Sequence, residues 1–117
     1  MSGRASRKKG HDFERKMART LTELTGRKWK RGIQARAGGA EGADVYTEGL
    51  PYHFECKKGK RPPLKGALEQ AERDCSEGDV PIAIAAIDRQ EPIVLMRLDA
   101  FLEMFQDHLC WVQHRSQ

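Results

Sequence analysis

A chain of 117 residues has room for one hydrophobic core, and 38% hydrophobic against 32% charged residues predicts a polar but folded protein. No apolar run approaches the roughly 20 residues that span a bilayer, and no apolar stretch follows the basic N-terminus as it does in a secretory signal. We therefore expect a cytoplasmic protein with no membrane partner. Three cysteines cannot all pair within one chain, and their spacing fits no zinc pattern.

Positive charge gathers in the first third of the chain. Residues 1–36 carry twelve lysines and arginines against three acidic residues, a balance of +9, which leaves −5 for the rest of a chain of net charge +4. Such a polarised chain presents a basic surface, for which polyanions are the natural partner. A solvated basic face that binds nothing is the alternative.

The predicted elements begin after residues 1–9, a basic segment without apolar periodicity that we expect to be a flexible arm. Residues 10–117 are expected to form a single domain. Four apolar residues recur at helical spacing: Phe13, Met17, Leu21 and Leu24. They predict a helix over residues 10–25 with a stop at Gly26, followed by an exposed strand over residues 27–37.

A glycine-rich loop over residues 37–43 leads into a short strand over residues 44–47. Residues 52–57 then alternate as in a strand, with Cys56 pointing to the opposite side from Glu55 and Lys57. The remaining elements are expected in this order: a basic loop over 58–63, a helix over 64–76, a buried strand over 81–87, a strand over 93–98 and a short helix over 100–105. This order predicts an α/β domain with a mixed central sheet flanked by helices.

Glu55 and Lys57 are the first candidates for a functional site. Residues i and i+2 of a strand share a face, so the carboxylate and the ammonium emerge side by side next to a basic loop. An ordinary ion pair on a strand has the same pattern.

Asp44 adds a second carboxylate at the mouth of the preceding strand. Two antiparallel strands joined by a turn can bring Asp44 and Glu55 to the same edge, where they repel unless a cation lies between them. Oxygen ligands without histidine or cysteine favour Mg²⁺ or Mn²⁺ over zinc. An aspartate that caps a turn is the plain alternative.

Glu14 follows Phe13 at the border of the apolar stripe of the first predicted helix. From there its carboxylate can reach a metal site between helix and sheet, or it can be a solvated helix acid.

Four segments in this order resemble the PD-(D/E)XK nuclease superfamily, and within it the archaeal and phage-type Holliday junction resolvases. They are Gly10–Glu14, Arg36–Ala40, Gly42–Val45 and Phe54–Lys57. Ala43 stands where the superfamily has a proline, and the glycine loop lacks the serine that members of the resolvase family often carry.

The resemblance implies a restriction-endonuclease-like core, a homodimer, and cleavage of four-way junctions or other branched DNA. By position, Glu14, Asp44, Glu55 and Lys57 match the active-site residues of the family. Asp44 and Glu55 would hold one or two Mg²⁺ ions, with Mn²⁺ able to substitute, Glu14 would complete the shell, and Lys57 would position the attacking water. No small-molecule cofactor is implied.

Basic residues on both sides of these motifs are candidates for contacts with the DNA backbone: Arg4, Arg7, Lys8, Lys9, Arg31, Arg36, Lys58, Lys60 and Arg61. The sequence does not assign roles to His11, Trp29, His53 or Gln70. Three other functions stay open: a nicking or restriction-like endonuclease with a different DNA preference, a non-catalytic DNA-binding protein of the same fold, and an RNA-processing nuclease.

Overall fold

The computed structural model describes residues 3–32 and 44–115 of the chain. Within these ranges the helices and strands are, in chain order, α1 (Gly3–Thr25), β1 (Lys30–Arg31), β2 (Val45–Tyr46), β3 (Tyr52–Gly59), α2 (Leu64–Asp74), β4 (Val80–Ile87), β5 (Ile93–Leu95) and α3 (Leu98–Arg115).

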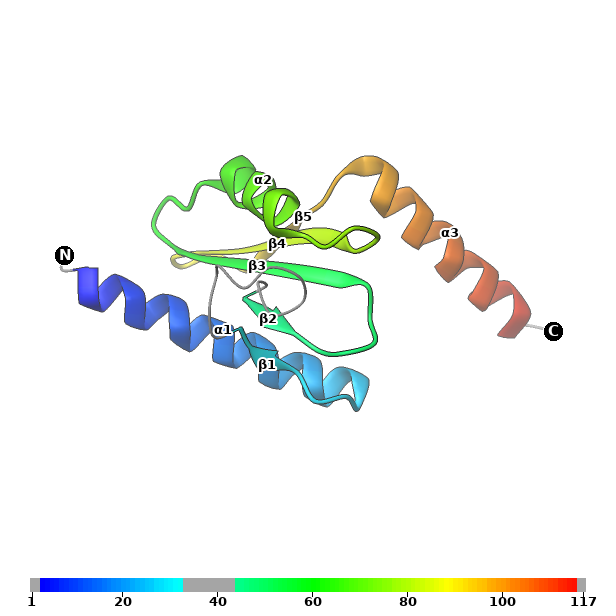
Figure 1. The fold of residues 1–117 in the computed structure, drawn as a ribbon, viewed down its shortest axis with the longest axis horizontal. Coiled ribbons are helices and arrows are strands. Elements are labelled where there is room, and N and C mark those ends of the chain that lie inside the picture. Colours follow the sequence, from blue (N-terminus) through cyan, green and yellow to red (C-terminus); the bar gives the residue numbers. More distant parts are fainter. Residues whose placement is uncertain (1–2, 33–43, 116–117) are drawn as a thin grey trace.

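The strands form one sheet in the order β1-β2-β3-β4-β5 (Figure 1). β3 and β4 are parallel, from Tyr52 opposite Val80 to Gly59 opposite Ile87, whereas the other neighbouring pairs are antiparallel. Parallel neighbours need a crossover between them, which α2 provides. The mixed sheet flanked by helices confirms the predicted fold class.

Helices α1 and α2 cover opposite faces of this sheet (Figure 1). On β4, Ile84 packs in one core cluster with Phe13 of α1, whereas the adjacent Ala83 packs in another with Leu68 of α2. Successive residues of a strand point to opposite faces, so β4 is buried on both sides. This accounts for its nearly continuous apolar sequence.

The N-terminal segment differs from the prediction, because α1 begins at Gly3 and takes in residues that we expected to form a flexible arm. Arginine, alanine and lysine favour helix, so this stretch needs no apolar periodicity to continue the helix beyond the core. Gly26, with φ of 73°, ends α1 as predicted and donates from its N–H to the carbonyl of Thr22 at 2.9 Å. Leu24, expected on the inner face, is exposed.

The C-terminal helix also differs from the prediction, because α3 extends to Arg115 instead of ending near residue 105. Its apolar residues continue at helical spacing through Leu109, but none of its residues is buried. Across residues 3–32 and 44–115, no helix combines the length and apolar character that a membrane span requires.

Candidate active site

Strand β3 presents Glu55 and Lys57 side by side, as its alternating pattern predicts. Cys56 points the other way and is buried in the cluster beneath α1, where burial and the surrounding carboxylates raise the pKa of its thiol. The carboxylate of Glu55 is almost fully buried, and its Oε2 lies 3.6 Å from Nζ of Lys57. Lys57 is half-buried, so its ammonium lies between the buried acid and solvent.

Asp44 immediately precedes β2 and is held against β3 by two hydrogen bonds. Its N–H donates to the carbonyl of Phe54 at 2.9 Å, and its Oδ2 accepts from the N–H of Cys56 at 2.8 Å. Val45 pairs with Phe54, so continuing this antiparallel register by one residue sets Asp44, just before β2, opposite Glu55. The two carboxyl groups that the sequence placed at one edge therefore do meet there.

The meeting of these groups changes the proton affinity of Asp44. Burial, followed by the negative charge of Glu55, raises the pKa of Asp44 from its usual 3.8 to about 7. Glu14 adds to this rise, while the hydrogen bond from Cys56 opposes it. The site thus contains more negative charge than its burial tolerates, which is the condition that a bound cation would relieve.

Glu14 lies near this pair but is engaged elsewhere. Its Oε1 accepts a hydrogen bond from Nε of Arg31 at 3.0 Å, and both side chains are largely shielded from solvent. Among the described residues, no group of three or more histidine, cysteine or acidic side chains is close enough to hold a metal ion. The structure therefore brings together Asp44, Glu55 and Lys57, with Glu14 paired to Arg31 beside them.

The candidate DNA contacts other than Arg31 and Lys58 fall into three groups. Arg7, Lys8 and Lys9 lie exposed on α1, and Lys60 and Arg61 lie exposed on the loop after β3. Arg4 is in α1, but its side chain and the whole of Arg36 lie outside the described residues, as does the whole of the predicted glycine loop.

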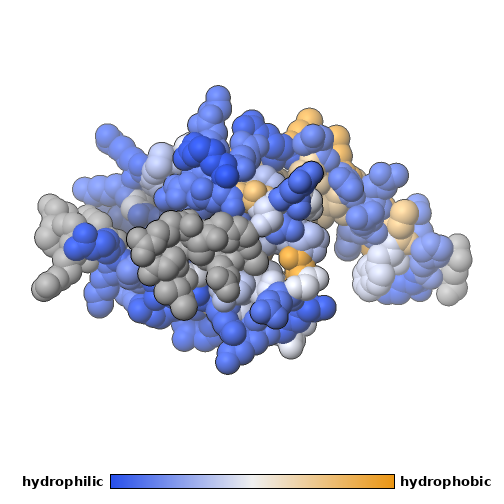
Figure 2. All heavy atoms as spheres, viewed as in Figure 1, coloured by the Kyte–Doolittle hydropathy of each residue, from blue (hydrophilic) through white to orange (hydrophobic). Residues whose placement is uncertain are grey.

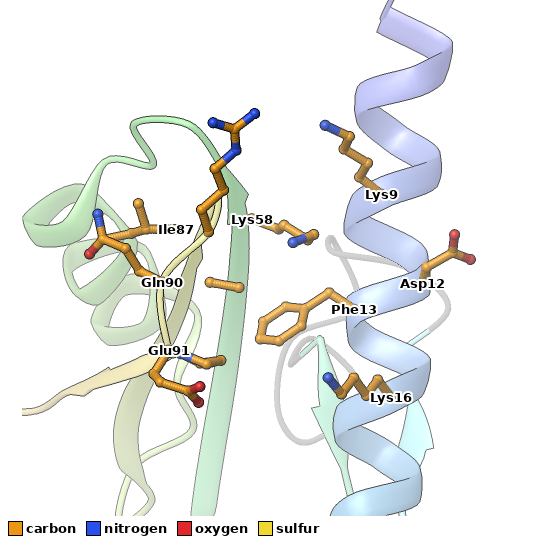
Figure 3. A pocket seen from close by; sticks show the side chains of 11 residues that line it. Lys9, Asp12, Phe13, Lys16, Lys58, Ile87, Gln90 and Glu91 are labelled. Carbon is orange, nitrogen blue, oxygen red and sulfur yellow. The ribbon is translucent and has the colours of Figure 1, made fainter.

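Lys9 and Lys58 approach each other across the gap between α1 and β3. Both make ion pairs with Asp88, at 4.0 and 3.9 Å respectively. They line a cavity of about 400 Å³ whose other lining residues include Phe13, Lys16 and Arg89, together with the acidic Asp12 and Glu91. Figure 3 shows the lysines of α1 and Phe13 directed toward β3, while Asp12 points away.

Sequence reasoning missed Lys16 and Arg89 as parts of this basic cavity. Lys9, Phe13 and Lys16 follow one another at intervals of four and three, so their shared face of α1 was present in the sequence as a signal. Arg89 lies in the turn between β4 and β5, and nothing in the sequence brings that turn to α1.

The four residues without an assigned role now have definite positions. Trp29 is a core residue. Its ring packs edge-on against that of Phe54, with the ring centroids 5.4 Å apart, and its Nε1 donates to Oγ1 of Thr25. His53 is fully buried, with Nε2 3.9 Å from Oε1 of Glu55. Of the other two, His11 is exposed and Gln70 is half-buried.

The α/β fold with a mixed sheet, together with an acidic pair and a lysine on adjacent strands, is that of a restriction-endonuclease-like nuclease. The chain matches a family model described as "Phage putative PDDEXK endonuclease" over residues 5–115, and it belongs to that family. The match confirms the superfamily that the sequence motifs resemble. No curated protein and no solved structure matches the chain at a significant level.

Proposed function

We propose that this protein is a divalent-metal-dependent DNA endonuclease that acts on branched DNA as a homodimer, with Asp44, Glu55 and Lys57 as its catalytic residues. The observation that carries the proposal is the buried contact between the carboxyl groups of Asp44 and Glu55, with the ammonium of Lys57 at 3.6 Å. A protein that only binds DNA electrostatically gains nothing from buried acids beside its basic surface.

The acidic pair fits a hard divalent cation. Its donors are carboxylate oxygens, which suit Mg²⁺ and Mn²⁺. Burial and the charge of Glu55 raise the pKa of Asp44, and a bound cation would favour the ionised form of this carboxyl group. Asp44 and Glu55 would hold the ion, with Glu14 joining them directly or through water. The ion would supply Lewis acidity toward the scissile phosphate and lower the pKa of a bound water.

The protein's own groups then have separate tasks. The N–H of Cys56 fixes the carboxylate of Asp44, which also contacts the carboxyl group of Glu55. Lys57 places a positive charge beside Glu55, where it can orient a water molecule and offset charge that develops on the phosphate. Arg31 holds Glu14 next to the pair.

The basic residues supply the grip on the DNA backbone. Lys9, Lys16, Lys58 and Arg89 surround the cavity between α1 and the sheet (Figure 3), and Lys60 and Arg61 continue from the end of β3. Phosphate contacts of this kind position a duplex without reading its bases, which favours recognition by shape.

The test compares four labelled substrates: a four-way DNA junction, a linear duplex of the same sequence, and RNA versions of both. Each is incubated with Mg²⁺, Mn²⁺ or EDTA. We expect metal-dependent cuts confined to the DNA junction. Equal cutting of the linear duplex would replace the junction preference with that of a general endonuclease, and preferential cutting of RNA would identify an RNA-processing nuclease. Binding to DNA without cleavage in either metal would contradict the enzymatic proposal.

A further inference from the structure

Helix α3 exposes a continuous apolar surface. Five large side chains follow intervals of three, one, three and four residues, which places them on one face of the helix: Leu98, Phe101, Leu102, Phe105 and Leu109. We call this set the α3 stripe. Each member is between 42% and 70% exposed, and Figure 2 shows hydrophobic side chains gathered over the first turns of α3.

The helix that carries the stripe is fixed at its base and projects from the body of the domain (Figure 1). Arg97, immediately before α3, binds both carboxylate oxygens of Glu72 on α2 at 2.8 Å. The rings of Phe101 and Phe105 stack with their centroids 5.9 Å apart, so these two members of the stripe form one continuous aromatic surface. The projecting helices contribute to principal extents of 56 × 31 × 27 Å.

The size of the stripe matches an interaction surface. Aromatic side chains present about 150–250 Å² each, so the two half-exposed phenylalanines alone offer on the order of 200 Å². The three exposed leucines add to this area. Apolar patches of a few hundred Å² mark binding sites on soluble proteins, and a stable interface buries about 800 Å² per partner. The stripe has the size of such a patch, and the polar positions that flank it would supply the rest of a stable interface.

We propose that the α3 stripe is the interface between two copies of this chain, with the two α3 helices antiparallel and crossing at Phe105. The stripe is self-complementary in this register, because Phe101 of one copy then lies beside Leu109 of the other. The first turn of α3 carries Asp99 and the last turn carries His114 and Arg115. An antiparallel pair therefore places the acidic end of one helix next to the basic end of the other, and it also aligns the helix dipoles favourably.

This inference rests on the homodimer of the proposed function and names the surface through which the two copies meet. Its test measures association, so its outcome does not depend on whether the protein cleaves DNA. The full chain is examined by sedimentation equilibrium over a range of concentrations. We expect a dimer that Phe105→Glu or Leu109→Glu weakens at least tenfold, because each places a charge inside the stripe. Cys110→Glu adds the same charge at an exposed position on another side of the helix and should leave the dimer intact. Circular dichroism checks that the variants remain folded.

A wild-type chain that stays monomeric at every concentration would overturn the inference. So would a dimer that neither stripe variant weakens, because the copies would then meet through another surface or the face would bind a different protein.

The antiparallel orientation has its own test, made in a Cys110→Ser background. An oxidised Phe105→Cys variant should form a disulfide-linked dimer, since the two copies of this residue meet at the crossing point. Leu98→Cys should not, because fourteen residues of helix separate it from the partner's copy by about 21 Å, far beyond disulfide reach. Cross-linking of Leu98→Cys would show a parallel pair and overturn the orientation.

Discussion

Glu55 has a different neighbour at each carboxylate oxygen, and this asymmetry defines the chemistry we assign to it. Oε2 lies 3.6 Å from the ammonium of Lys57, and Oε1 lies 3.9 Å from Nε2 of the buried His53. The carboxyl group of Asp44 approaches from the adjacent strand. In the proposed mechanism, Glu55 binds a cation together with Asp44, while Lys57 acts on the substrate.

Replacing Lys57 should therefore separate catalysis from metal binding. Lys57→Gln should slow cleavage roughly 100- to 1,000-fold, the usual cost of removing one donor that stabilises developing charge. Binding of Mn²⁺, followed by calorimetry, should persist, and Lys65→Gln on the exposed side of α2 should leave both measurements unchanged. A Lys57→Gln variant that cleaves within tenfold of the wild-type rate would remove this residue from the mechanism.

The raised pKa of Asp44 predicts how stability depends on pH when no metal is bound. The folded state holds this proton up to about pH 7, whereas the unfolded chain loses it near 3.8. The contribution of Asp44 to the free energy of unfolding is complete below pH 4 and is lost as the pH rises through 7. At about 1.4 kcal/mol per pKa unit, the loss is on the order of 4 kcal/mol.

Urea unfolding in EDTA between pH 4 and 8 measures this effect as a difference between variants. The stability of wild-type protein should fall relative to that of Asp44→Asn as the pH rises toward 7. Asp107→Asn, an exposed control on α3, should follow the wild type throughout. Parallel curves for wild type and Asp44→Asn would mean that Asp44 is not a perturbed acid.

At the scale of elements, α1 supports the site through its apolar face. Phe13 packs against the sheet in the cluster that holds Val45 and Cys56. These two residues directly follow Asp44 and Glu55 in the chain. The docking of one helix face therefore determines whether β2 and β3 keep the acidic pair in register.

Truncation of this contact should cost stability in proportion to its burial. Phe13→Ala should lower the free energy of unfolding by about 3–5 kcal/mol, as is usual for a buried phenylalanine. Leu24→Ala, on the same helix but 77% exposed, should change it by less than about 1 kcal/mol. Chemical denaturation compares the two variants, and equal losses would contradict the packing of α1 described above.

The lysines between α1 and β3 allow a prediction about the salt dependence of DNA binding. If Lys9 and Lys58 contact phosphates, Lys9→Gln and Lys58→Gln should each reduce the slope of log affinity against log salt by about 0.9. Fluorescence anisotropy with a duplex in EDTA measures this slope without cleavage. The matched controls Lys65→Gln and Arg73→Gln, both on the exposed side of α2, should not alter it. Unchanged slopes for both lysine variants would place the DNA elsewhere.

Across the whole molecule, the sequence correctly predicted the features that follow from the alternation or periodicity of neighbouring residues. The alternation over residues 52–57 gave the correct faces of Glu55, Cys56 and Lys57, and the apolar run over residues 81–87 gave a strand buried on both sides. The approach of Asp44 to Glu55 followed from an antiparallel turn. These features depend on strand geometry alone, so a single sequence contains them.

The missed features depend on contacts between distant segments or on surfaces without a partner. The pairing of Glu14 with Arg31 joins a helix to a strand 17 residues away, and sequence spacing does not show that they meet. The full length of α3 was not predicted, because its apolar stripe does not pack against the core of the domain. Arg89 reached the basic cavity only because the β4–β5 turn lies against α1.

The measurement that tests the central claim most directly is cleavage of a branched DNA substrate by Asp44→Asn beside wild-type protein and Asp107→Asn. In Mg²⁺, we predict that wild type and Asp107→Asn cut at similar rates, while Asp44→Asn yields no product above the background in EDTA. Retained binding of DNA by Asp44→Asn would show that the loss is one of chemistry. Cleavage by Asp44→Asn at the wild-type rate would contradict the assignment of the Asp44 and Glu55 pair as the active site.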